Sequence, residues 1–149
     1  MTTIVAVSTT EFNVPVTAIA ILQYTAHTLR PAKLARWGVF ADAISTQSQP
    51  VIVDLIRNVA AGTFSGAAIT PAVVRPVGMS VAGTWAFMSS VPPAQNGVAL
   101  DGAEFHPQSG YEYTFPLGDE PEIPGGGRVA IQVLASNTVG IRAKMTVKE

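Results

Sequence analysis

The clearest pattern in the chain is a strict alternation of apolar and polar positions near its end. Every second residue from 139 to 147 is apolar, and the residues between them are polar, cationic or glycine. Period-two alternation predicts a β-strand with one face buried and the other in water. Residues 128–135 alternate in the same way, and Ser136 and Asn137 form a short turn signal between the two runs. We therefore expect a β-hairpin here.

The rest of the chain is a series of short β-prone runs separated by glycine and proline. Further strands are expected at residues 16–26, 34–41, 50–59, 79–88, 98–105 and 111–115. The 50–59 run also fits a helical stripe, but its β-branched Val-Ile-Val start favours a strand. Residues 71–78 are interpreted as a long loop crossing between sheets. The pattern predicts one all-β domain over residues 15–149, an antiparallel β-sandwich or jelly roll of about eight strands.

Residues 1–14 form a separate segment, because no turn signal pairs them with the strand expected next. They are rich in β-branched residues and precede Pro15. Three interpretations stay open: an edge strand, an extended arm that reaches a neighbouring subunit, or a frayed terminus.

Composition limits the classes of function. The chain has 149 residues, no cysteine, a net charge of −1 and only 13% charged residues. Disulfides and thiolate chemistry are therefore excluded, and no basic patch indicates nucleic-acid binding. No apolar run is long enough for a membrane helix, and the start lacks signal-peptide features, so we expect neither membrane insertion nor secretion. With 48% hydrophobic residues, either a large core or a surface covered in an assembly would explain the low charge.

Few residues are candidates for chemistry. His106 with Glu104, and the distant His27, are too few for an ordinary zinc site, so turn or surface roles are favoured. Ser65 lies in a glycine-bounded turn rather than a nucleophile elbow. The glycines at 125–127 precede a β-branched run rather than a helix, which argues against a phosphate loop.

One carboxylate has the surroundings expected of a sugar-binding site. Glu112 lies between Tyr111 and Tyr113, although any half-buried strand would place two rings on one side and the acid on the other. A small β-sandwich enzyme using Glu112 and His106 is thus the weakest hypothesis. We expect no enzyme, and assign no catalytic, cofactor-binding or metal residue.

The two tryptophans, Trp37 and Trp85, are expected in the core. Trp37 has a second interpretation, since Arg36 precedes it. If Trp37 faced outward beside this cation, it would be an interface anchor.

Several short segments together resemble a known family. They include residues 33–39 (KLARWGV), 65–71 (SGAAITP), 104–107 (EFHP), 110–113 (GYEY) and 124–131 (PGGGRVAI). Their order over residues 30–149 resembles the small jelly-roll decoration or cement proteins of tailed bacteriophages and prophages. Residues 1–14 are not covered by this resemblance.

The resemblance implies a structural virion protein, made in the host cytoplasm, that binds the outside of a capsid and bridges major capsid protein subunits. It implies self-association as a homotrimer, and no cofactor, nucleic acid or membrane. The candidate interface residues are Thr2, Thr3, Ile4, Val5, Arg36 and Trp37. The alternative is a tail-associated β-sandwich module that binds a carbohydrate or a receptor.

Overall fold

All regular elements in the described part of the chain are β-strands, and that part contains no helix. The computed structural model describes residues 2–14, 17–41, 49–58, 60, 62–66, 69–76, 80–91, 99–136 and 138–149. The strands are β1 (Ile4–Ser8), β2 (Phe12–Val14), β3 (Ile19–Thr25), β4 (Ala32–Ala41), β5 (Val51–Asn58), β6 (Thr63–Phe64), β7 (Ala72–Arg75), β8 (Thr84–Phe87), β9 (Ser89–Val91), β10 (Asp101–Phe105), β11 (Gly110–Thr114), β12 (Glu122–Ile123), β13 (Arg128–Ala135) and β14 (Val139–Lys148).

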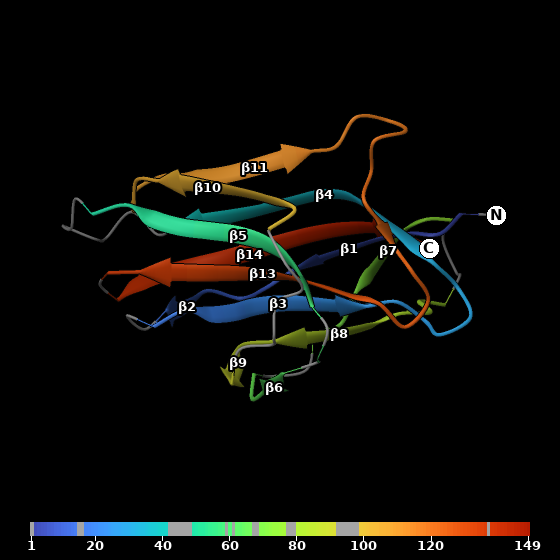
Figure 1. Ribbon diagram of the computed structural model, residues 1–149, viewed down its shortest axis with the longest axis horizontal. Helices are drawn as coiled ribbons and strands as arrows, with labels where there is room; N and C mark the ends of the chain where they lie inside the picture. The colour runs from blue at the N-terminus through green and yellow to red at the C-terminus, as the bar shows by residue number, and fades with distance from the viewer. Residues whose placement is uncertain are drawn as a thin grey trace.

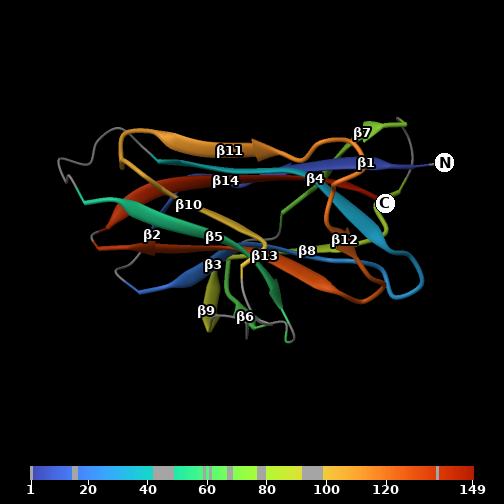
Figure 2. The same ribbon diagram turned by 45° about the horizontal axis from the view of Figure 1, so that its top comes forward.

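Two antiparallel sheets pack face to face, which confirms the predicted β-sandwich (Figures 1 and 2). The seven-stranded sheet has the order β11-β4-β14-β1-β7, with β12 beside β4 and β2 beside β14. The five-stranded sheet has the order β10-β5-β13-β3-β8. In Figure 2 the two sheets form separate layers, and the short strands β6 and β9 lie beyond the five-stranded layer.

The longer strands pair as a nested set. β1 pairs with β14, β3 with β13, β4 with β11, and β5 with β10. The chain is therefore wound like one long hairpin folded across two layers. Numbered one to eight along the chain, these strands lie in the order 6-3-8-1 in one sheet and 5-4-7-2 in the other.

The alternating pattern of the sequence places one apolar face of each sheet in a shared core. The inward residues of β14, from Val139 to Val147, are at most 3% exposed. They pack in the same cluster as inward residues of β3, β5 and β13 from the other sheet. Burial of this apolar surface is the main favourable contribution to folding.

The expected hairpin between residues 128–135 and 139–147 is wrong, although both strands are present. β13 pairs with β3 and β5, whereas β14 pairs with β1, β2 and β4. The connection after Ala135 thus passes from one sheet to the other. Alternation shows which face of a strand is buried but does not identify its partner, and both strands bury their apolar face in the same core.

The expectations for residues 1–14 are also corrected. β1 is not a free arm, because it pairs with β14 on one side and β7 on the other. Between β1 and β2 the pairing with β14 shifts by one residue. At this bulge the Thr9 hydroxyl accepts a hydrogen bond from the Ala143 amide at 2.9 Å, which keeps a buried donor satisfied. The β-branched residues Ile4, Val5 and Val7 therefore lie in an inner strand.

Residues 72–75 contain strand β7 rather than the predicted loop. β7 adds to the sheet beside β1, and the Arg75–Pro76 peptide bond that follows it is cis. Within the described ranges no helix is long and apolar enough to cross a membrane.

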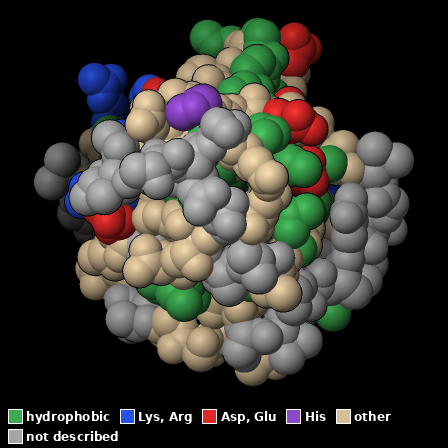
Figure 3. Space-filling model, turned by 90° about the vertical axis from the view of Figure 1, so that its left-hand side faces the viewer, with side chains coloured by type: hydrophobic (Ala, Val, Ile, Leu, Met, Phe, Trp, Pro, Cys, Tyr) green, Lys and Arg blue, Asp and Glu red, His purple; other side chains and the backbone are tan. Residues whose placement is uncertain are grey.

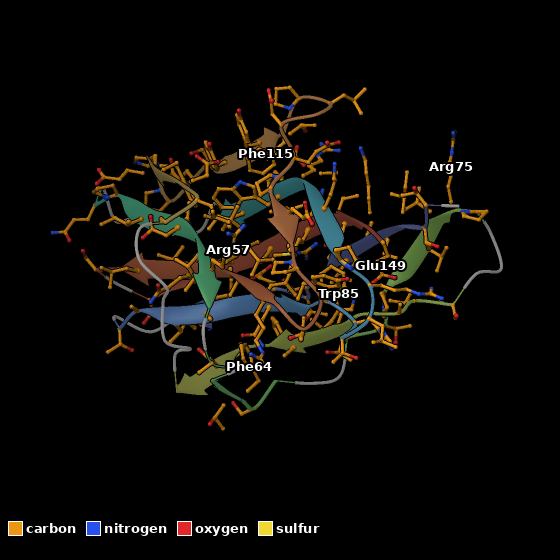
Figure 4. The ribbon with its side chains drawn as sticks, turned by 45° about the vertical axis from the view of Figure 1, so that its right-hand side comes forward. Arg57, Phe64, Arg75, Trp85, Phe115 and Glu149 are labelled. Atoms are coloured by element: carbon orange, nitrogen blue, oxygen red, sulfur yellow. The ribbon has the colours of Figure 1, made fainter. Side chains whose placement is uncertain are left out.

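A second, smaller core lies on the outer side of the five-stranded sheet. Ala20, Ile56 and Ala130 face away from the main core, yet each is at most 1% exposed. Phe64 of β6 packs against them, and Figure 4 shows this ring beneath the sheet. The Ser89 hydroxyl of β9 accepts a hydrogen bond from the Ala20 amide at 2.9 Å. The two-stranded β6–β9 ribbon therefore covers this face.

Candidate functional site

The outer face of the seven-stranded sheet carries a groove. Two adjoining hollows of about 320 and 480 Å³ share Ala6, Arg36 and Thr146 as lining residues. We call them together the sheet groove. Small side chains such as Ala6 and Ala72 form its floor, and Val74 and Phe115 lie on its walls. The groove exists because these outward positions carry short side chains between longer ones on neighbouring strands.

Charged residues along the groove are held in place by specific partners. Arg36 of β4 forms an ion pair with Glu112 of β11 at 2.7 Å. Lys144 of β14 lies over the Phe40 ring, 4.7 Å from its centre, a cation–π contact. The groove therefore has an apolar floor bordered by charged groups of both signs, an arrangement suited to a protein surface.

At one end of the groove, Glu120 ties the β11–β12 connection to β14. Lys148 Nζ donates a hydrogen bond to one carboxylate oxygen, and the Gly118 amide donates to the other. The hydrogen bond from Lys148 lowers the pKa of Glu120 most, and the hydrogen bond from Gly118 lowers it further. The lowered pKa means that the ionised form is the one the fold stabilises.

Asp101 joins the two sheets inside the sandwich. It lies on β10 of the five-stranded sheet and accepts hydrogen bonds from Trp37 Nε1 at 3.0 Å and from the Tyr111 hydroxyl at 3.2 Å. Both donors belong to the seven-stranded sheet, and their rings are tilted against each other with centres 5.2 Å apart. Burial, and then the Asp101 carboxylate, raise the pKa of Tyr111. The tie is structural, because these donors satisfy the partly buried carboxylate.

A second carboxylate makes a similar tie at the end of the sandwich where β14 finishes. Glu149 accepts hydrogen bonds from the amides of Ala82 and Gly83 and from the hydroxyl of Tyr24, at 2.8 to 3.0 Å. A Cβ at Gly83 would lie 2.3 Å from the Tyr24 ring, so this approach requires glycine. Burial, and then Glu149, raise the pKa of Tyr24. Figure 4 shows Glu149 near Trp85, whose ring packs on Tyr24.

The structure divides the predicted interface residues between surface and core. Ile4 and Arg36 both line the sheet groove, although they are 32 positions apart in the sequence. Thr2 is exposed and lines an adjoining groove near the chain ends. Thr3 is 6% exposed and buried.

The remaining two, Val5 and Trp37, are fully buried. Trp37 is therefore a core residue and not an outward anchor. Its neighbour Arg36 faces outward, so the cation and the ring lie on opposite sides of β4.

The residues considered for chemistry lie apart. His27 and His106 each accept a hydrogen bond from a backbone amide two residues ahead, which confirms turn positions for both. No group of three metal-ligating residues occurs among the described residues. Tyr111 faces the core while Glu112 faces outward to Arg36, as expected of a half-buried strand. Ser65 follows β6, and its amide donates a hydrogen bond to the Met88 carbonyl.

Figure 3 views the sandwich from the end that lies away from the two chain termini. A few described acidic and basic side chains are scattered there, and the basic ones form no continuous patch.

A scan against protein-family models and a search of curated proteins gave no match to this chain.

Sequence reasoning missed most of the groove. Lys144 was recognised only as a polar position of a strand, and Ala6 and Ala72 carried no signal of a binding surface. The alternation in β14 correctly placed Lys144 and Thr146 on the outer face. The alternation does not give the register of strand pairing, which brings β1, β4 and β7 together with β14 around the groove.

Proposed function

We propose that this chain is a structural virion protein that binds the outside of a bacteriophage capsid and stabilises it by bridging major capsid protein subunits. The observation that carries the proposal is the strand order. An arrangement of 6-3-8-1 over 5-4-7-2 is the one expected of a jelly roll, an architecture that recurs in viral capsid proteins. This support is an analogy at the level of the fold.

The surface that supports binding is the sheet groove. Short side chains under an open face leave space that a partner can fill, and Arg36 and Lys144 provide charged contacts beside it. Binding that spans several capsid subunits stabilises the shell by linkage and gains from several linked contacts. The protein associates with itself as a homotrimer in this proposal.

Co-sedimentation with undecorated capsids tests the proposal. The unmodified protein should pellet with the capsids and raise their melting temperature. Lys144→Glu should weaken this binding, because it reverses a charge on the groove, whereas Arg128→Glu on the five-stranded sheet makes the same charge change elsewhere and should not. No pelleting, or equal loss in both variants, would contradict the proposal. A clear hit on a glycan array would favour the carbohydrate-binding alternative.

A further inference from the structure

One large apolar side chain is exposed to solvent at the end of the sandwich that holds the two chain termini. Leu29 is 85% exposed in the turn between β3 and β4. This turn is well ordered by hydrogen bonds. The Arg30 amide donates to the His27 carbonyl at 3.0 Å, and the Leu29 amide donates to His27 Nδ1 at 3.2 Å. The turn therefore holds Leu29 outward in a fixed backbone.

The glycines at 125–127 support this turn from one side. The Gly126 amide also donates to the His27 carbonyl, at 3.3 Å. A Cβ on Gly125 would lie 2.4 Å from the Thr28 carbonyl oxygen, so the two turns are in backbone contact that only glycine permits. A displayed side chain on a fixed turn loses little conformational entropy on binding.

A groove lies directly beside the same turn. It has a volume of about 440 Å³ and is lined in part by Pro31, Ala32 and Leu117. Leu117 is itself 89% exposed. We call this the end groove. Its apolar lining and its volume suit a small apolar side chain with a few polar neighbours.

The charges of the turn and the end groove are of opposite sign. The end groove contains the carboxylates of Glu120, Glu122 and Glu149 and the ammonium groups of Lys33 and Lys148, an excess of one negative charge. The turn carries the guanidinium of Arg30 next to Leu29. Glu122 has no ion-pair partner among the described residues, although it lies opposite Lys33 in the β12–β4 pairing and its carbonyl accepts a hydrogen bond from Arg57.

We propose that Leu29 of one copy of this chain inserts into the end groove of a second copy, with Arg30 facing Glu122 of that copy. In the head-to-tail form of this contact, each copy inserts its turn into one neighbour and receives the turn of another, and such contacts close into rings when the rotation allows. The inference builds on the self-association in the proposed function. Its surface does not include Lys144, although Leu117, Glu120 and Lys148 line both the end groove and one hollow of the sheet groove.

Sedimentation of the isolated protein over a concentration series gives the first test. The unmodified chain should sediment as an oligomer, and Leu29→Asp as a monomer. Leu134 is the matched control, a leucine 41% exposed on β13, and Leu134→Asp should remain oligomeric. A monomeric unmodified chain, or an oligomeric Leu29→Asp, would overturn the proposal. Loss of capsid pelleting with an unchanged oligomer in Leu29→Asp would identify the capsid as the occupant and overturn it as well.

Engineered cysteines give a second test, because the chain has no native cysteine that could form a competing disulfide. Leu29→Cys protein mixed with Leu117→Cys protein should form mixed disulfide dimers on mild oxidation, because these positions meet only between copies in this arrangement. Leu134→Cys should not link to either. Linkage of Leu29→Cys only to itself would contradict a head-to-tail contact. Sedimentation and disulfide formation are both measured on the isolated protein, so failure of capsid binding leaves these two results unaffected.

Discussion

The outer faces of the two sheets carry similar small side chains but differ in what covers them. Both carry small outward side chains: Ala20 and Ala130 on the five-stranded sheet, and, on the seven-stranded one, Ala6 of β1 and Ala72 of the edge strand β7. On the first, Phe64 and the β6–β9 ribbon fill the space. On the second, the space is open and bordered by charged side chains. Figure 4 shows the contrast, with Phe64 on one side of the sandwich and Phe115 on the other.

The comparison shows that exposure is decided by what covers a sheet and not by the sheet itself. A small residue beneath a ring belongs to a core, whereas the same residue beneath nothing forms the floor of a groove. In this protein the covered face is held by apolar contacts and a buried hydroxyl. The open face is held by ion pairs at its margins. Each kind of contact responds to a different perturbation, and three experiments separate them.

The largest effect is expected from Ile56→Ala on the covered face. Ile56 is 1% exposed although it points away from the main core. Removing a buried aliphatic side chain destabilises a protein by about 2–5 kcal/mol through lost burial and the cavity left behind. Urea unfolding monitored by tryptophan fluorescence measures the change.

Thr146→Ala on the open face is the control for Ile56→Ala, and should change the free energy of unfolding by less than about 0.5 kcal/mol. Equal effects of the two substitutions would show that the ribbon does not bury Ile56 in solution.

A smaller effect is expected from Ser89→Ala, which removes the hydroxyl that anchors the ribbon. The Ala20 amide would lose its acceptor in a buried position, at a cost of about 1–3 kcal/mol. Hydrogen exchange should show faster exchange of the Ala20 amide in the variant. Ser8→Ala, at an exposed position of β1, should leave stability and exchange unchanged. If Ala20 exchanges equally slowly in the Ser89 variant, the hydroxyl is not its acceptor.

The sequence predicts the strands of this fold far better than their partners. The alternation of β14 correctly gave its buried face, yet it assigned β13 as a hairpin partner, because both strands present an apolar face to one core. Ile56 lies within a strand predicted from its β-branched start, but its burial depends on Phe64 of the next strand, β6, which packs on the outer face of the sheet. Ile4 and Arg36 were each candidates for an interface, and only the register of β1, β14 and β4 places them in one groove.

The smallest effect is expected at the margin of the open face, and it depends on pH. The hydrogen bonds from Lys148 and Gly118 lower the pKa of Glu120, so its carboxylate stabilises the fold above the ordinary glutamate pKa of about 4.3. That contribution is lost as the pH falls through the lowered pKa of the folded state. Glu120→Gln should therefore be less stable than the unmodified chain near neutral pH, and the difference should disappear in acid. Thermal unfolding across a pH series measures it.

Lys148→Met provides the matched variant for this pH effect, since it removes the first of the two donors. It should reduce the same pH-dependent difference, and the double variant should add little, because the two side chains act as one pair. The covered face has apolar contacts and a neutral hydroxyl, so the destabilisation caused by Ile56→Ala should not vary across this pH range. If the stability of Glu120→Gln fell in acid as much as that of the unmodified chain, the titrating group would lie elsewhere. The margin of the open face would then be stabilised by packing, as the covered face is.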